Sequence, residues 1–196
     1  MLFAVLALAL AAPASAAASP RVADRLGELG RWAEAHGAGA ADAVLDEAAA
    51  YWFAGNKNGR ALNGGGPALA AAIRLARAEA LRGPVKRLPA ALKRTFAPHY
   101  SGNALDKARW LVAAPSSPLG RLLARWPVKE GAVTLGEVIV FKTERAARST
   151  LLFAHELVHV EQYRRLGIDG FAQRYAVART SMEDEARLKA HRVVPG

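Results

Sequence analysis

Apolar and polar positions alternate with helical periodicity over three segments before residue 84, namely 21–36, 41–55 and 67–83. In the third segment Pro67 stands at a first-turn position and Gly83 follows the last apolar residue. We interpret all three as helices. Their apolar stripes are typical of a protein core, and we assign no chemistry to them.

The middle of the chain changes pattern. Residues 108–114 (ARWLVAA) and 137–142 (EVIVFK) are rich in Val, Ile, Trp and Phe and predict strands, and a short helix is expected over 90–95. The chain therefore predicts an α+β fold that is mostly helical, with a small β-sheet near its middle.

Helical periodicity returns from residue 143 to residue 166, with Thr143 or Ser149 as the N-cap. Gly167 is expected to end this helix and Asp169 to cap the next one. A last helix is expected from Ser181, with Asp184 in position to complete a capping box.

The stretch LLFAHELVHVEQY carries the chemistry of the chain. His155 and His159 are four residues apart, so on a helix they project from one face, about 40° and about 6 Å apart. Two neutral imidazoles in this arrangement can hold zinc, and Glu156 between them can take a proton from a water molecule. The surrounding residues are apolar, and buried polar groups without partners are costly. One turn beyond His159, Gln162 is expected either to touch the site or to meet solvent.

A third metal ligand must come from His, Asp or Glu, because the chain has no cysteine. The glycine and third histidine of the metzincin motif are absent. Four residues downstream of the motif offer a ligand atom: Asp169, Glu183, Glu185 and His191. Glu185 is the preferred candidate, because it precedes the small Ala186 and resembles the third-ligand glutamate of gluzincin peptidases. Asp169 resembles the corresponding aspartate of aspzincins but competes with a role as N-cap, and Glu183 also remains open.

The first residues of the chain predict where the protein acts, and its net charge predicts what its surface attracts. Residues 1–16 form an apolar run ending in Ala-Ser-Ala, which predicts a secretory signal peptide and hence a secreted or periplasmic protein. The formal net charge is +10, which favours attraction to an anionic envelope surface. The basic stretch 81–94 has no interleaved aromatics and no nucleic-acid motif, so we expect a solvated basic face and no nucleic-acid partner.

The run from TLGEVIVF through HELVHVEQYRRLGIDGF resembles the zincin-like metallopeptidase family of the extracellular contractile injection system core domain. The resemblance spans roughly residues 92–191. It implies a minimal zincin fold, with the small sheet packed on the HExxH helix and N-terminal helices before it. It also implies that extended substrate pairs with an edge strand at 137–141. Tyr175 is expected to pack as an aromatic on the active helix, the alternative being that it steadies an oxyanion.

These observations predict three parts: a signal peptide at 1–16, a helical region at 17–85 and a zincin-like domain at 86–196. The leading hypothesis is a zinc-dependent peptidase acting on a peptide or protein substrate. In it, Zn²⁺ is held by His155, His159 and Glu185, and Glu156 is the catalytic base. The alternative is a noncatalytic zincin scaffold that binds an anionic surface or a protein partner.

Overall fold

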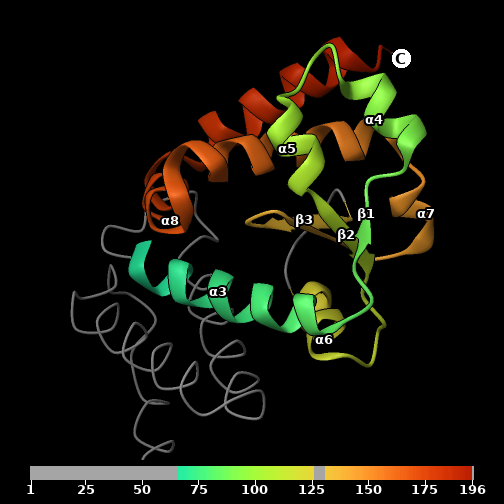
Figure 1. Ribbon diagram of the computed structural model, residues 1–196. Coiled ribbons are helices and arrows are strands. Elements are labelled where there is room, and N and C mark those ends of the chain that lie inside the picture. The colour runs from blue at the N-terminus through green and yellow to red at the C-terminus, as the bar shows by residue number, and fades with distance from the viewer. Residues whose placement is uncertain (1–65, 126–130, 196) are drawn as a thin grey trace, which may run out of the picture.

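A computed structural model describes residues 66–125 and 131–195 (Figure 1). The predicted signal peptide and the helices expected at 21–36 and 41–55 lie outside the described residues. The described elements, in chain order, are α3 (Gly66–Arg82), β1 (Lys86–Arg87), α4 (Ala90–Phe96), α5 (Gly102–Lys107), β2 (Arg109–Val112), α6 (Pro118–Arg125), β3 (Ala132–Leu135), β4 (Val138–Phe141), α7 (Glu144–Ala147) and α8 (Thr150–Val193). The predicted α+β fold, mostly helical with a small sheet, is confirmed.

The four strands form one mixed sheet in the order β1-β2-β4-β3. β2 and β4 are parallel, whereas β3 and β4 are antiparallel and joined by a tight turn in which Gly136 has a φ of 66°. The expectation that 137–141 forms an exposed edge is therefore wrong, because β4 is paired on both sides. The edge strand beside it is β3, whose four residues are too few to show a clear alternation.

β4 lies between two layers of helices, and its alternating side chains enter two cores. Val138 and Val140 pack in the cluster that includes α3 and α6 residues, whereas Ile139 and Phe141 pack in the cluster that includes the start of α8. All four are fully buried. Figure 1 shows the sheet between α3 on one side and α8 on the other. A strand buried on both faces reads as a continuous apolar run, and this is how VIVF appears in the sequence.

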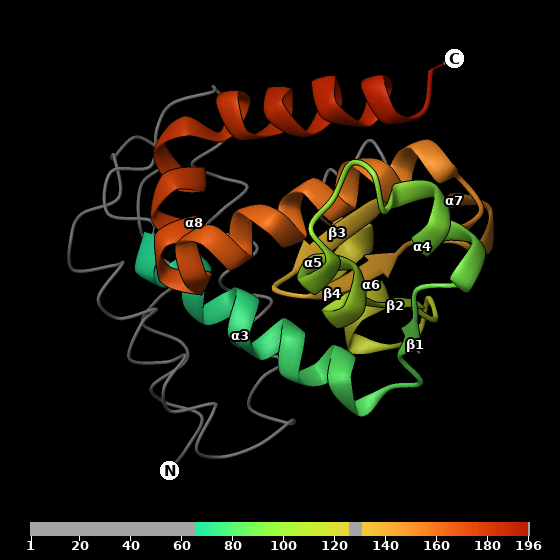
Figure 2. The same ribbon diagram turned by 45° about the horizontal axis from the view of Figure 1, so that its top comes forward.

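α8 is not one straight helix. Its backbone leaves helical geometry at Gly167 (φ 68°, ψ 175°) and at Ala178 (φ −135°, ψ 37°). Figure 2 shows that the last segment folds back along the first. The predicted end at Gly167 is confirmed, whereas the second break precedes the start expected at Ser181. Ser149 caps α8 through the amide of Leu152.

Two other predicted caps act differently from expectation. Thr143 does cap a helix, but it is the separate short α7, through the amide of Ala146. Asp169 pairs with Arg74 of α3 at 2.6 Å. This ion pair and a large apolar contact tie α3 to the bend of α8.

Hydrogen bonds of Glu161 and Tyr100 hold the last segment of α8, which folds back along the first, in its place. The Glu161 carboxylate accepts hydrogen bonds from the Ser101 backbone amide at 2.9 Å and from Lys189 Nζ at 2.6 Å. The Tyr100 hydroxyl donates to the carbonyl of Ala154 at 2.8 Å, one residue before the first motif histidine. These contacts hold the loop before α5 and both long segments of α8 in one arrangement.

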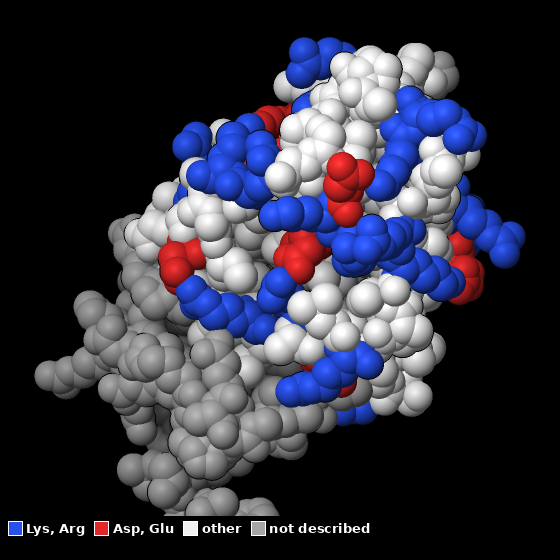
Figure 3. Space-filling model, in the orientation of Figure 1, with Lys and Arg blue, Asp and Glu red and all other residues white. Residues whose placement is uncertain are grey.

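Lys and Arg side chains are spread across the face seen in Figure 3, with acidic side chains among them. Several of the basic groups are paired, for example Lys93 with Asp106 at 2.7 Å. Lys86 lies 4.7 Å from the centre of the Trp110 ring. Within 66–125 and 131–195, no helix is both long and apolar enough to cross a membrane.

Candidate metal centre

The HELVH motif lies in the first segment of α8, on the side of the sheet opposite α3. His155, Glu156 and His159 are 5%, 3% and 6% exposed. Their helix is buried because Leu157 and Val158 pack into the core on neighbouring faces. Three polar side chains at this depth require partners from elsewhere in the fold.

His155, His159 and Glu183 form a cluster whose ligand atoms all lie within 4.8 Å of one another. The two Nε2 atoms are 3.1 Å apart. Glu183 Oε2 lies 3.3 Å from His155 Nε2, and Glu183 Oε1 lies 3.7 Å from His159 Nε2. Two imidazoles and a carboxylate thus converge on one point and are close enough to bind a metal ion.

Glu183, rather than the preferred Glu185, is the acidic residue that the structure brings to the histidines. The two side chains are two positions apart, about 200° around a helix, so they cannot share one target. The Glu185 carboxylate accepts hydrogen bonds from Gln162 Nε2 at 2.9 Å and from Arg165 at 3.0 Å. The other candidate, Asp169, is engaged with Arg74.

Gln162 belongs to the surroundings of the site, and the alternative of a solvent-facing side chain is wrong. It is fully buried. Its Oε1 lies 2.8 Å from His159 Nδ1, and its Nε2 donates to Glu185 and to the carbonyl of Met182 at 3.1 Å. Gln162 therefore connects a metal-facing histidine with the returning segment of α8.

Glu156 points toward the edge strand. The Thr134 hydroxyl on β3 donates to Glu156 Oε2 at 2.6 Å. Burial raises the pKa of Glu156 above its usual range, and the neighbouring histidines and the Thr134 hydrogen bond counteract part of that rise. A carboxylate of raised pKa beside a metal site is suited to accept and return a proton near neutral pH.

His159 and Glu183 shift each other's pKa. Burial lowers the pKa of His159, but the hydrogen bond to Glu183 and the charges of Glu156 and Glu183 outweigh it and raise that pKa to about 9. Burial opposes ionisation of Glu183, yet hydrogen bonds to both histidines hold its pKa well below its usual range. Because a metal ion binds a deprotonated ring nitrogen, a cation and a proton compete for His159.

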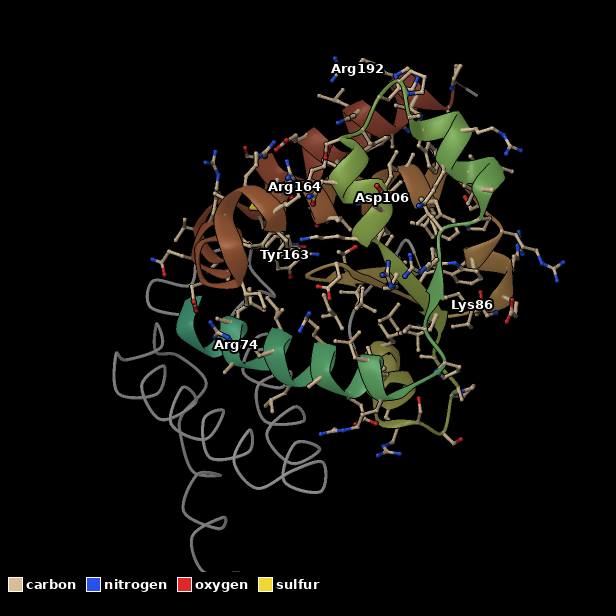
Figure 4. The ribbon with its side chains drawn as sticks, viewed as in Figure 1. Arg74, Lys86, Asp106, Tyr163, Arg164 and Arg192 are labelled. Atoms are coloured by element: carbon tan, nitrogen blue, oxygen red, sulfur yellow. The ribbon has the colours of Figure 1, made fainter. Side chains whose placement is uncertain are left out.

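Tyr175 was expected to pack directly on the motif segment of α8, but in the described ring contacts it is connected to that segment only through Phe171. Its ring stacks on Phe171 with centroids 5.3 Å apart, and Phe171 stacks on Tyr163 at 3.6 Å. Figure 4 shows Tyr163 on the side of α8 that faces α3. The Tyr175 hydroxyl also donates to Glu183 Oε1, and burial raises the pKa of Tyr175, so it stays a donor. It orients the carboxylate of the cluster.

Thr134, which touches the predicted base, was not expected from the sequence. Its only signal is its place in the TLG run two residues before the turn into β4. A hydroxyl in an otherwise apolar strand is a weak signal, because threonine is common in strands.

A comparison with protein families finds a match to the eCIS core domain over residues 87–167. No curated protein and no solved structure matches. The matched span includes His155, Glu156, His159 and Gln162 and ends at the first break of α8. Glu183, Glu185 and Tyr175 lie beyond it. The match supports a relation between this chain and eCIS proteins over the span that carries the two histidines.

Proposed function

We propose that this protein is a zinc-dependent hydrolase that cleaves peptide bonds. The observation that carries the proposal is the convergence of His155, His159 and Glu183 with the buried Glu156 beside them. The predicted zincin-like fold enters here as part of the same proposal, supported by the packing of the motif helix against a small mixed sheet.

The residues fit zinc by their chemistry. Two imidazoles and one carboxylate are a known donor set of catalytic zinc sites, which leave a further position open. Glu183 is ionised, and Gln162 and Tyr175 hold His159 and Glu183 in place. Buried imidazoles with their Nε2 atoms 3.1 Å apart gain a shared partner when a cation binds.

A zinc ion held there would acidify a water molecule and polarise the scissile carbonyl. Glu156 accepts the proton of the attacking water as its oxygen bonds to the carbonyl carbon. Glu156 then delivers that proton to the amine nitrogen as the carbon–nitrogen bond breaks, so each turnover returns it to its ionised form. Thr134 holds the Glu156 carboxylate on the side of the edge strand β3.

The noncatalytic alternative requires that protein groups close the metal site. A structural site would be completed by a fourth ligand, and Glu185 was the nearest source of one. Its carboxylate is instead engaged with Gln162 and Arg165. Among the residues that the structure describes, the cluster holds three ligating side chains, and this favours the hydrolytic site.

The setting of the activity is part of the proposal. The match to the eCIS core domain supports a role connected with a contractile injection system. The apolar run at residues 1–16 supports action outside the cytoplasm, on a protein or peptide substrate. The net charge of +10 supports contact with an anionic envelope surface.

The test combines metal analysis with a single substitution. Protein purified without a metal-affinity tag is expected to contain about one zinc per chain. Glu156→Gln should keep the zinc and lose hydrolysis of a peptide library by about 100-fold or more, since general bases contribute roughly 10²–10⁴-fold. Absence of zinc binding, or full activity of Glu156→Gln, would overturn the proposal.

A further inference from the structure

We propose that Glu185 is a positioning residue that fixes the amide of Gln162 and, through it, the tautomer of His159, so that His159 Nε2 faces the metal. This inference rests on the proposed metal site. In this role Glu185, the residue that resembles a gluzincin ligand, is separated from the metal by Gln162 and His159.

The chain of hydrogen bonds begins with groups that can only accept. The oxygens of the Glu185 carboxylate accept hydrogen bonds from Gln162 Nε2 at 2.9 Å and from Arg165 at 3.0 Å. The Met182 carbonyl is likewise an acceptor. Both lie within 3.1 Å of one end of the Gln162 side chain. Only the NH₂ end of the amide can satisfy two acceptors, so the oxygen end is turned the other way.

The oxygen end of Gln162 meets His159. Oε1 is 2.8 Å from Nδ1 of the ring, and an amide oxygen can only accept. Nδ1 must therefore carry a proton, and the ring nitrogen that remains for a metal is Nε2. That atom faces the cluster, 3.1 Å from His155 Nε2. A reversed amide would place NH₂ against Nδ1 and favour the opposite tautomer.

Arg165 holds Glu185, the residue of this hydrogen-bond series that lies nearest to solvent. Arg165 lies one turn beyond Gln162 and contacts both carboxylate oxygens of Glu185, at 3.0 and 3.3 Å. The Glu185 side chain is 42% exposed, whereas Gln162 is fully buried. Substitution at Glu185 therefore changes the orientation of a buried amide without opening a cavity beside the histidines.

The experiment measures zinc affinity by competition with a chromogenic chelator. Glu185→Leu removes the acceptor, and Glu185→Gln keeps an acceptor oxygen for Gln162 and Arg165 but removes the charge. We expect Glu185→Leu and Gln162→Leu to weaken zinc binding by about 10- to 100-fold, as outer-sphere partners typically do. Glu185→Gln should stay close to wild type. Asp184→Ala, a neighbouring acid paired only with Arg187 in the described contacts, is the matched control.

A second readout follows the proton itself. Long-range ¹H–¹⁵N spectra of the zinc-loaded protein should show a protonated Nδ1 on His159 in wild type and Glu185→Gln, and its loss or fast exchange in Glu185→Leu. Equal zinc affinity and equal His159 spectra in all Glu185 variants would overturn the inference. Equal weakening by Gln and Leu would also overturn it, since a metal ligand or a purely electrostatic partner behaves that way. A wild-type protein that binds no zinc would overturn the proposed function and this inference together. A wild-type protein that binds zinc, with Glu185 variants that behave identically to it, would overturn this inference alone.

Discussion

The first and last segments of α8 supply the same site in different ways. Over residues 150–166 the spacing of the motif alone places His155, Glu156 and His159 on neighbouring faces of one helix. Over residues 179–193, two acidic residues two positions apart take different roles: Glu183 reaches the histidines and Glu185 reaches Gln162. A local motif specifies ligands on its own helix, whereas a ligand on a returning segment depends on how that segment docks.

The largest effect is expected from removing Glu183, the acidic residue that the last segment of α8 contributes to the site. Glu183→Ala leaves two imidazoles without the carboxylate that converges on them, and we expect zinc affinity to fall by more than about 100-fold, beyond the range of outer partners. Chelator competition measures the loss. Asp184→Ala should bind zinc as wild type does. Full zinc affinity in Glu183→Ala would show that Glu183 is not the third metal ligand.

The next test concerns the first segment and the strand beside it. Thr134→Val removes the hydroxyl that donates to Glu156 at 2.6 Å. That hydrogen bond lowers the pKa of Glu156, so its loss raises the pKa. The base must be ionised to act, and the acidic limb of the pH–rate profile should therefore move to higher pH.

Hydrogen bonds to charged groups contribute about 1.5–3 kcal/mol, so activity of Thr134→Val on that limb should fall by roughly 10- to 100-fold. Zinc content should not change. Thr134→Ser keeps the hydroxyl and serves as the control. If the acidic limb of Thr134→Val does not shift, the Thr134 hydrogen bond does not affect the pKa of the catalytic base.

The smallest effect is expected at the bend that joins the two segments. Gly167 has φ 68° and ψ 175°, and an added Cβ would meet no atom within 4 Å. Gly167→Ala therefore carries only backbone strain, which costs about 1–3 kcal/mol in such regions. Thermal or urea unfolding measures it. Gly102→Ala, with equally open surroundings and no positive φ, is the control. Equal stability of the two variants would show that the bend tolerates a side chain.

Predictions from the sequence succeeded where the interactions are local. The helix at 67–83, the strands around Trp110 and Ile139, and the helix end at Gly167 were all expected from periodicity and punctuation. The edge strand was misplaced, because pairing order depends on contacts between distant residues. β3 has a burial pattern without clear alternation, and only its hairpin with β4 reveals it.

The amino-acid sequence by itself determined the HExxH helix, because residues four apart share a face on any helix and the apolar residues around them bury it. It also determined that no cysteine thiolate is a ligand of the site, because the chain has no cysteine. The tertiary structure decided that Glu183 joins the histidines, that Glu185 and Gln162 connect to His159, and that Thr134 meets Glu156. Each of these contacts joins residues whose approach depends on the bends of α8 and the order of the strands, and no periodicity along the chain encodes such an approach.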